Sequence, residues 1–402
     1  MKRVFVLATV AALGLAAAQN TVNILWSGAV TGPTSDVGGP YGAGIEDYCK
    51  YANEQKLIPN ITLACTVRDD QYQNPNTQRI FEEALDRAKP AMYLGYSTGA
   101  MLQLKPLINE VKMPTIPASA HIGLIDPPNN QFMFLAASSY SEQIVALQEY
   151  INRDFKKGAK IALVVNPSPF GRAVVDHARR AAQRLGQTVV DVREVGGGNL
   201  DNTALLRALD QAGAEFILHQ NVAGPVANIL KDAKRLGLDS KIRQMGAVYT
   251  GGSDLIRLAG DAAEGFLWAS SYFTLDENTP GITLQKQLAA RYGRNADILN
   301  STNYTAGMLA AAITVEAMKR AAQRNNGRIN SDTVYQAIIG MNGPNAYKPG
   351  FAVSTKQGIE IDFSRSEQTG AEGLRVLEAK GGKFVPTGPA FTSQVFRAVR
   401  NP

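Results

Sequence analysis

Cysteine and histidine are scarce in this chain of 402 residues, which has two Cys and three His. Two cysteines are too few for a zinc finger, an iron–sulfur protein or a disulfide-rich small domain. The histidines, His121, His177 and His219, lie far apart and show no metal-ligand spacing. The sequence therefore predicts neither a metal site nor a cofactor.

A strong excess of charge of one sign is also missing. The 41 Lys and Arg stand against 35 Asp and Glu, and the basic residues are spread along the chain, so nucleic-acid binding is not expected. No phosphate-binding loop of the form GxxxxGK[ST] and no HExxH motif occurs. Asp69 and Asp70 end a strand and are expected to be solvated turn residues. With no catalytic constellation in view, the sequence predicts a binding protein and not an enzyme.

Long apolar runs are confined to the N-terminus. After Lys2 and Arg3, residues 4–18 are largely apolar and end in three alanines before Gln19. This pattern is typical of a secretory signal peptide that is cleaved near Ala18. A membrane anchor is the alternative, but it needs about 20 apolar residues. We therefore expect residues 1–18 to be removed and the protein to be periplasmic or secreted.

Short β-rich runs alternate with helical segments along most of the chain. The alternation covers residues 21–117 and restarts near residue 140. It predicts an α/β fold of two doubly wound, Rossmann-like lobes built from βαβ units around parallel sheets. Residues 350–386 are expected to add hairpin strands. The glycine clusters at residues 38–42 and 196–198 are expected to be turns, because neither has the context of a nucleotide loop.

The two cysteines fall in neighbouring elements. Cys49 lies in the first expected helix, residues 41–53, and Cys65 in the strand that follows, residues 61–67. Disulfides form and persist in exported proteins, so we expect Cys49 and Cys65 to be bridged. The alternative is a pair of buried thiols that pack as small apolar groups.

Polar loops follow two neighbouring strands. Residues 95–99, with Ser97 and Thr98, precede a helix whose N-terminus would attract a carboxylate, although an N-cap without a ligand is the alternative. Residues 118–121 follow the next strand and should emerge at the same sheet edge, where open α/β sheets bind ligands. Phe170 and Tyr249 lie in loops at the matching edge of the second lobe. The sequence therefore predicts a small-molecule site between the lobes.

Several segments, in order along nearly the whole chain, resemble the type I periplasmic binding proteins. The resemblance is to the hydrophobic amino acid and amide group, the leucine/isoleucine/valine receptors of ABC importers. The segments that carry it are residues 24–33, 68–71, 93–99, 116–119, 161–171 and 263–266.

The resemblance implies two lobes joined by three crossovers, with the ligand in the cleft. Lobe 1 would comprise residues 19–139 plus 271–371, and lobe 2 residues 140–270 plus 372–402. A monomer of this family binds a branched-chain or hydrophobic amino acid and delivers it to permease subunits at the membrane. An alternative is a ligand-sensing receptor subunit with the same fold.

The resemblance also implies which residues bind the ligand. In the family, the loop at residues 97–98 and the loop at residues 118–120 hold the carboxylate and part of the ammonium. Phe170 would lie over the ligand side chain, and the loops at residues 221–222 and 248–249 would close from lobe 2. The implied ligand-binding residues are Ser97, Thr98, Ala118, Ser119, Ala120, Phe170, Asn221 and Tyr249.

One departure from the family concerns the ligand ammonium. Leucine receptors place a Glu near Val248 and a Thr near Ala120, and this chain has neither. Burial of an ammonium without an anionic partner costs on the order of several kcal/mol. A branched-chain amino acid remains the expected ligand, and an amide or an aromatic or aliphatic carboxylate without an ammonium is the alternative.

Overall fold

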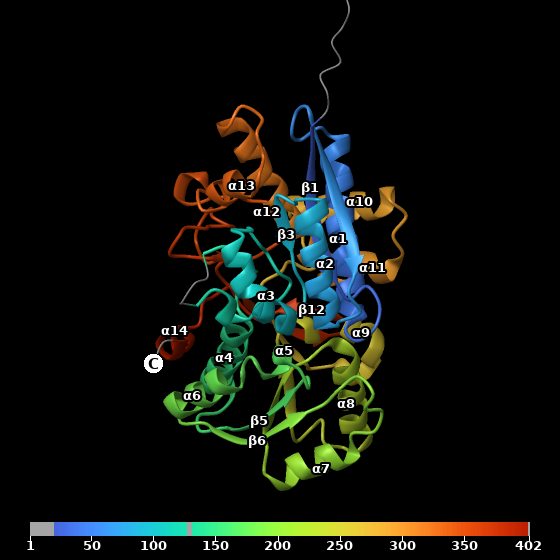
Figure 1. Cartoon of the computed structure of the whole chain (residues 1–402). Helices are drawn as coiled ribbons and strands as arrows, with labels where there is room; N and C mark the ends of the chain where they lie inside the picture. The colour runs from blue at the N-terminus through green and yellow to red at the C-terminus, as the bar shows by residue number, and fades with distance from the viewer. Residues whose placement is uncertain (1–19, 127–130, 401–402) are drawn as a thin grey trace, which may run out of the picture.

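The computed structural model describes residues 20–126 and 131–400, so the predicted signal peptide lies outside the described residues. Figure 1 shows two lobes, one above the other. Lobe 1, at the top, is built around strands β1 (Asn20–Gly28), β2 (Ile61–Asp69) and β3 (Met92–Leu94). Lobe 2, at the bottom, is built around strand β5 (Lys160–Val165) and its neighbours.

Lobe 1 contains a short parallel sheet in the strand order β2-β1-β3. A separate parallel pair joins β4 (Leu135–Ala137) to β10 (Thr369–Ala371). Thr115 makes only single bridges to Tyr93 and Met133, which interrupts the sheet between β3 and β4. The helices of this lobe are α1 (Ser35–Glu54), α2 (Asn74–Arg87), α3 (Thr98–Glu110), α10 (Pro280–Arg291), α11 (Ala296–Asn300), α12 (Thr302–Arg324) and α13 (Ser331–Ile338).

Lobe 2 contains a continuous seven-stranded sheet in the order β12-β11-β9-β8-β7-β5-β6. Five strands are parallel: β5 with β6 (Thr188–Glu194), β7 (Phe216–Gln220), β8 (Arg243–Gly246) and β9 (Leu267–Ser270). The expected hairpin is β11 (Arg375–Lys380) with β12 (Lys383–Pro386), and it is antiparallel. Strand β5 is buried along almost its whole length, as expected for a parallel strand covered on both faces. The helices of this lobe are α4 (Tyr140–Tyr150), α5 (Pro169–Arg172), α6 (Val175–Leu185), α7 (Thr203–Gln211), α8 (Ala223–Arg235), α9 (Ser253–Ala259) and α14 (Gln394–Arg400).

The chain passes between the lobes after β4, after β9 and after β10. The first and third crossings touch, because Ser138 Oγ donates to Gly373 O at 3.0 Å. Helix α14 packs on α4 and α6 of lobe 2. Its Arg400 reaches the Asp126 carboxylate at 3.0 and 3.2 Å, and Lys105 of α3 donates to Asp126 O. This ion pair therefore joins the lobes beside the crossings.

The glycine-rich segment 38–42 is helical, so the predicted turn is wrong. Gly38 lies in α1, and a Cβ there would come within 2.0 Å of Ala29 O. Further along α1, a Cβ on Gly44 would come within 2.4 Å of Tyr304 O in α12. These glycines permit close packing of the helix against its neighbours. Segment 196–198 is turn and loop, as predicted.

Two crosslinks fix α1 within lobe 1. The predicted disulfide joins Cys49 of α1 to Cys65 of β2. Asp47 of α1 is 0% exposed and accepts from Arg294 at 2.8 and 2.7 Å and from the Tyr304 hydroxyl at 2.8 Å. Helix α1 is thereby tied to β2, to α12 and to the loop that follows α10.

Within residues 20–126 and 131–400, no helix is both long and apolar enough to cross a membrane. Within the same two ranges, no group of three or more His, Cys, Asp or Glu side chains is placed to hold a metal ion.

Candidate functional site

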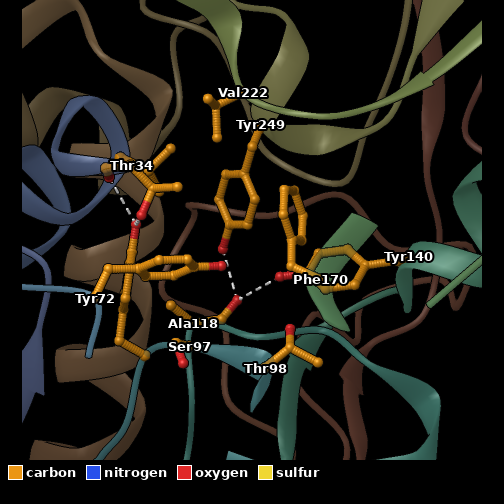
Figure 2. A pocket seen from close by; sticks show the side chains of 11 residues that line it. Thr34, Tyr72, Ser97, Thr98, Ala118, Tyr140, Phe170, Val222 and Tyr249 are labelled. Atoms are coloured by element: carbon orange, nitrogen blue, oxygen red, sulfur yellow. Dashed lines mark hydrogen bonds between the residues drawn. The ribbon is translucent and has the colours of Figure 1, made fainter. Parts of the chain in front are cut away.

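A small cavity lies where the two lobes meet (Figure 2). The empty space at the cavity, including the open solvent at its mouth, is about 270 Å³. Lobe 1 supplies one side of it and lobe 2 the other. The lining residues are Thr34, Val37, Tyr72, Tyr96, Ser97, Thr98 and Ala118 from lobe 1, with Tyr140, Phe170, Val222 and Tyr249 from lobe 2.

The N-terminus of α3 forms the hydroxyl-rich end of the cavity. Ser97 is the N-cap and accepts from the Ala100 N–H at 3.1 Å. Thr98 follows as the first helical residue, and its Oγ1 shares a hydrogen bond of 2.7 Å with Ser119 Oγ. The first N–H groups of a helix have no intrahelical acceptor, and they carry the positive end of the helix dipole. This end of the cavity is suited to a carboxylate.

Residues 95–99 also fit the G-x-S-x-G pattern of hydrolase nucleophiles. Ser97 Oγ, however, donates to Asn74 Oδ1 at 3.3 Å and accepts from a backbone N–H. A serine nucleophile needs a histidine base at its hydroxyl, and the residues that line the cavity include no histidine. The serine is therefore a helix cap and not a nucleophile.

Tyrosine hydroxyls meet a backbone carbonyl at the wall of the cavity. The Tyr249 hydroxyl donates to Ala118 O at 2.6 Å, and the Tyr140 hydroxyl donates to the same oxygen at 3.4 Å. Figure 2 shows both hydroxyls turned toward Ala118. Since Ala118 belongs to lobe 1 and Tyr249 to lobe 2, the bond from Tyr249 joins the lobes across the cavity.

Aromatic rings form the lobe 2 wall. The ring centroids of Tyr140 and Phe170 are 5.2 Å apart, and those of Phe170 and Tyr249 are 6.0 Å apart. Burial raises the pKa values of the Tyr140 and Tyr249 phenols, so both hydroxyls stay protonated and neutral. With Val222, these rings offer an apolar surface to a ligand.

Two lining residues of lobe 1 have left-handed backbones. Thr34 has φ 63° and Tyr72 has φ 60°, which is unfavourable for side chains of this size. Thr34 receives the Tyr96 hydroxyl on its carbonyl oxygen at 2.9 Å. The Tyr72 N–H donates to Asp70 Oδ1 at 2.9 Å. Local bonds thus hold both residues in conformations that direct them to the cavity.

Asp70 corrects the expectation of a solvated acidic turn. It is 0% exposed, and its second carboxylate oxygen accepts from Thr77 Oγ1 at 2.8 Å. Burial raises the pKa of the Asp70 carboxyl by more than the hydrogen bond from Thr77 lowers it. Asp69 is exposed, as expected, but it is the last residue of β2, and its carboxylate accepts from Thr31 Oγ1 at 2.6 Å. Asp70 is therefore a support for Tyr72 and does not line the cavity.

The predicted site residues fall into two groups. Ser97, Thr98, Ala118, Phe170 and Tyr249 line the cavity. The other three, Ser119, Ala120 and Asn221, lie behind the lining: Ser119 bonds Thr98, Ala120 O accepts from the Tyr140 N–H, and the Asn221 amide donates to Val195 O.

Six lining residues are absent from the predicted set: Thr34, Val37, Tyr72, Tyr96, Tyr140 and Val222. Tyr96 lies inside the predicted loop 95–99, and Val222 is adjacent to Asn221. Both residues could therefore have been predicted from their positions in the sequence. Tyr140 lies at the first crossing, at the start of α4. Thr34 and Tyr72 reach the cavity through left-handed turns that the sequence pattern does not reveal.

Two lobes that meet around a cavity, each supplying part of its wall, define a protein that binds a small molecule in an interlobe cleft. The sequence profile of the periplasmic binding protein family matches residues 21–383, and the chain belongs to this family. Its members are binding proteins, so the chain is not an enzyme. Membership confirms the predicted family and α/β fold class.

Curated relatives of the chain are amino-acid-binding proteins by name. The leucine-, isoleucine-, valine-, threonine-, and alanine-binding protein of Pseudomonas aeruginosa is 21% identical over 250 residues, which cover 62% of this chain and 66% of that protein. The Leu/Ile/Val-binding protein homolog 1 of Brucella melitensis is 25% identical over 251 residues, covering 59% and 63%. The chain thus matches just under two thirds of the length of these relatives.

Solved structures share the whole fold. The crystal structure of a branched chain amino acid ABC transporter from Thermus thermophilus with bound valine is 67% identical, with a TM-score of 0.94 and coverage of 96% of this chain and 100% of that one. A fatty acid ABC transporter substrate-binding protein from Thermomonospora curvata has a TM-score of 0.79 at 18% identity, covering 95% and 94%. The second likeness concerns the fold alone.

Proposed function

We propose that this protein is the substrate-binding component of an ABC importer. It binds a branched-chain or other hydrophobic amino acid between the lobes and delivers it to permease subunits at the membrane. The proposal includes export to the periplasm with cleavage near Ala18 and a monomeric state. It also includes the predicted lobe boundaries, residues 19–139 plus 271–371 and residues 140–270 plus 372–402.

The distribution of polar groups in the cavity carries the proposal. The α3 N-terminus offers hydrogen-bond donors, and the tyrosine hydroxyls and the Ala118 carbonyl offer oxygen atoms. Phe170, Val222 and Val37 add apolar surface. A zwitterion with a small apolar side chain matches all three features. The valine bound to the 67% identical Thermus thermophilus protein supports the same ligand class.

The proposed roles follow the geometry. Ser97 and Thr98, supported by Ser119, bind the carboxylate. Ala118 and Tyr249 lie at the amino end, and Phe170 contacts the ligand side chain. Ala120 and Asn221 act from behind, because their polar atoms bond other protein groups.

Identification of the ligand tests the proposal directly. Protein purified from its own compartment is denatured, and the released small molecule is identified by mass spectrometry. Calorimetry then compares L-valine, L-leucine and L-isoleucine with L-lysine and L-glutamate. We expect a released branched-chain amino acid and tight binding of the apolar set only. Binding of none of the three branched-chain amino acids would refute the proposed ligand class.

A second ligand class is favoured by one specific observation. No Asp, Glu, Lys, Arg or His side chain is among the described residues that line the cavity. A hydrophobic carboxylate or amide without an ammonium would need no anionic partner there. Tight binding of 3-methylbutanoate, which is valine without its amino group, at the expense of valine would favour this class.

A further inference from the structure

Three of the four tyrosines that line the cavity donate their hydroxyl protons to backbone carbonyls. Tyr249 and Tyr140 donate to Ala118 O at 2.6 and 3.4 Å, and Tyr96 donates to Thr34 O at 2.9 Å. A phenol has one O–H donor, and its oxygen lone pairs accept. Once the proton is committed, the oxygen can offer a ligand only an acceptor. The wall that these three hydroxyls form is therefore neutral and rich in acceptors.

Such a wall favours a ligand that donates hydrogen bonds. The three phenols are buried, and burial raises their pKa values, so none becomes a phenolate near neutral pH. Hydrogen bonds from a charged donor are stronger than those between neutral groups. The rings themselves also attract a cation through their π faces. An ammonium is thus stabilised here without a carboxylate.

Asp70 and Asp36 interact electrostatically with the lining residues Tyr72 and Tyr96, but their carboxylates are occupied elsewhere. Both oxygens of the Asp70 carboxylate accept hydrogen bonds, one from the Tyr72 N–H and one from Thr77 Oγ1. The Asp36 carboxylate lies within reach of the backbone N–H groups of Val37 and Gly224. Neither residue lines the cavity. Both carboxylates therefore serve the protein and not a ligand.

We propose that the ligand ammonium is bound by the hydroxyl oxygens of Tyr249 and Tyr140, whose protons are held by Ala118 O, and that no carboxylate contacts it. This inference rests on the proposed function, since it assumes an amino acid ligand. It assigns Tyr249 and Tyr140 as the residues that distinguish an amino acid from the corresponding carboxylic acid.

The test measures how strongly the amino group contributes to binding. Calorimetry gives the dissociation constants of 3-methylbutanoate and L-valine, and their ratio reports recognition of the ammonium. We expect a large ratio for the unaltered protein. Tyr249→Phe should lower it about tenfold, because one acceptor for a charged donor is lost. Tyr140→Phe should lower it less, since its bond to Ala118 is longer.

Control variants separate this effect from general damage. Tyr347→Phe removes the hydroxyl of a tyrosine in lobe 1 that bonds Tyr48 at 3.4 Å and lies outside the cavity lining. It should leave the ratio unchanged. Asp36→Asn should also leave the ratio unchanged. Thermal unfolding shows whether each variant is folded, and Tyr140→Phe serves as the test if Tyr249→Phe is not.

The outcomes distinguish failure of the inference from failure of the proposed function. If no branched-chain amino acid binds, both are overturned. If valine and 3-methylbutanoate bind equally, the amino group is not recognised and the inference alone fails. It also fails if the ratio is large but survives both tyrosine substitutions, or if Asp36→Asn abolishes it.

Discussion

The two lobes differ both in how they are stabilised and in what they give to the cavity. Lobe 2 has one continuous seven-stranded sheet, whereas the sheet of lobe 1 is divided into three strands and a separate pair. Lobe 1 compensates with the Cys49–Cys65 disulfide and the buried Asp47–Arg294 pair. It also supplies Ser97, Thr98 and the Ala118 carbonyl, while lobe 2 supplies the rings of Phe170 and Tyr249.

This difference indicates that the two lobes contribute different contacts to ligand recognition. Fixed donors and acceptors have to be placed accurately, and the crosslinked lobe carries the α3 N-terminus and the Ala118 carbonyl. Apolar contact tolerates more variation, and the lobe with the continuous sheet contributes Phe170 and Val222 to it. Recognition of the carboxylate should therefore depend on lobe 1, and recognition of the amino group and of the ligand side chain on lobe 2.

Loss of the buried ion pair in lobe 1 should have the largest effect. In Arg294→Met, the Asp47 carboxylate stays buried without its charged partner, which should lower the free energy of unfolding by about 3–5 kcal/mol. Denaturant unfolding measures this. Arg291→Met is the matched control, because its partner Glu54 lies in an exposed pair that should contribute less than about 1 kcal/mol. Equal losses in the two variants would contradict the assignment.

Removal of the disulfide should come next. Cys49 and Cys65 are 16 positions apart, and closing a loop of this size stabilises by about 3 kcal/mol in the chain-entropy model. We expect the Cys49→Ala/Cys65→Ala protein to unfold at lower denaturant concentration and to bind ligand with unchanged affinity. Reducing agent should shift the unaltered protein to the same midpoint and leave the variant where it is. A variant that is as stable as the unaltered, oxidised protein would show that the disulfide does not stabilise lobe 1.

The polar end of the cavity can be removed without breaking its helix. Thr98 is the first residue of α3, where proline is tolerated, and Ser97 already has the extended backbone (φ −73°, ψ 141°) that proline requires before it. Thr98→Pro deletes a hydroxyl and an N–H, so affinity should fall about 100-fold by calorimetry.

Thr302→Pro makes the same change at the start of α12 and should leave affinity unaltered. Thr98→Val removes the hydroxyl alone and should cause a smaller loss. If Thr98→Pro binds normally while remaining folded, the α3 N-terminus does not bind the carboxylate.

In lobe 2 we expect an acid sensitivity from His219. Burial lowers the pKa of this imidazole to about 4, and Nε2 bonds Gln244 Oε1 at 2.8 Å. The unfolded chain binds the proton more tightly, so stability present above pH ~6.5 is lost as pH falls toward 4, by about 1.4 kcal/mol per unit.

His219→Gln should flatten this dependence in denaturant titrations between pH 7 and pH 4.5. His177→Gln is the control and should flatten the dependence less, because burial also lowers the pKa of His177 but that residue is only half-buried. An unchanged slope in His219→Gln would exclude His219 as the source.

The sequence predicted elements whose signal is local. Strand β5 reads as an unbroken apolar run, and the Ser97 loop stands between a strand and a helix. The turn expected at Gly38 failed because that glycine serves close packing against Ala29. Tyr72 and Tyr140 were missed because the lining residues that they contact lie on other elements of the chain. Tyr72 packs against Tyr96, and Tyr140 packs against Phe170 and Tyr249. Only the fold brings such residues together.

The C-terminal helix has a mechanical consequence. Helix α14 packs on lobe 2. Arg400, the last residue of this helix, nevertheless donates hydrogen bonds to the Asp126 carboxylate of lobe 1. Any rotation of one lobe against the other must either carry this helix along or pull the pair apart. The last turn of α14 therefore limits how far the two lobes can separate. The limit depends on the strength of the Arg400–Asp126 pair and on how tightly α14 packs against lobe 2.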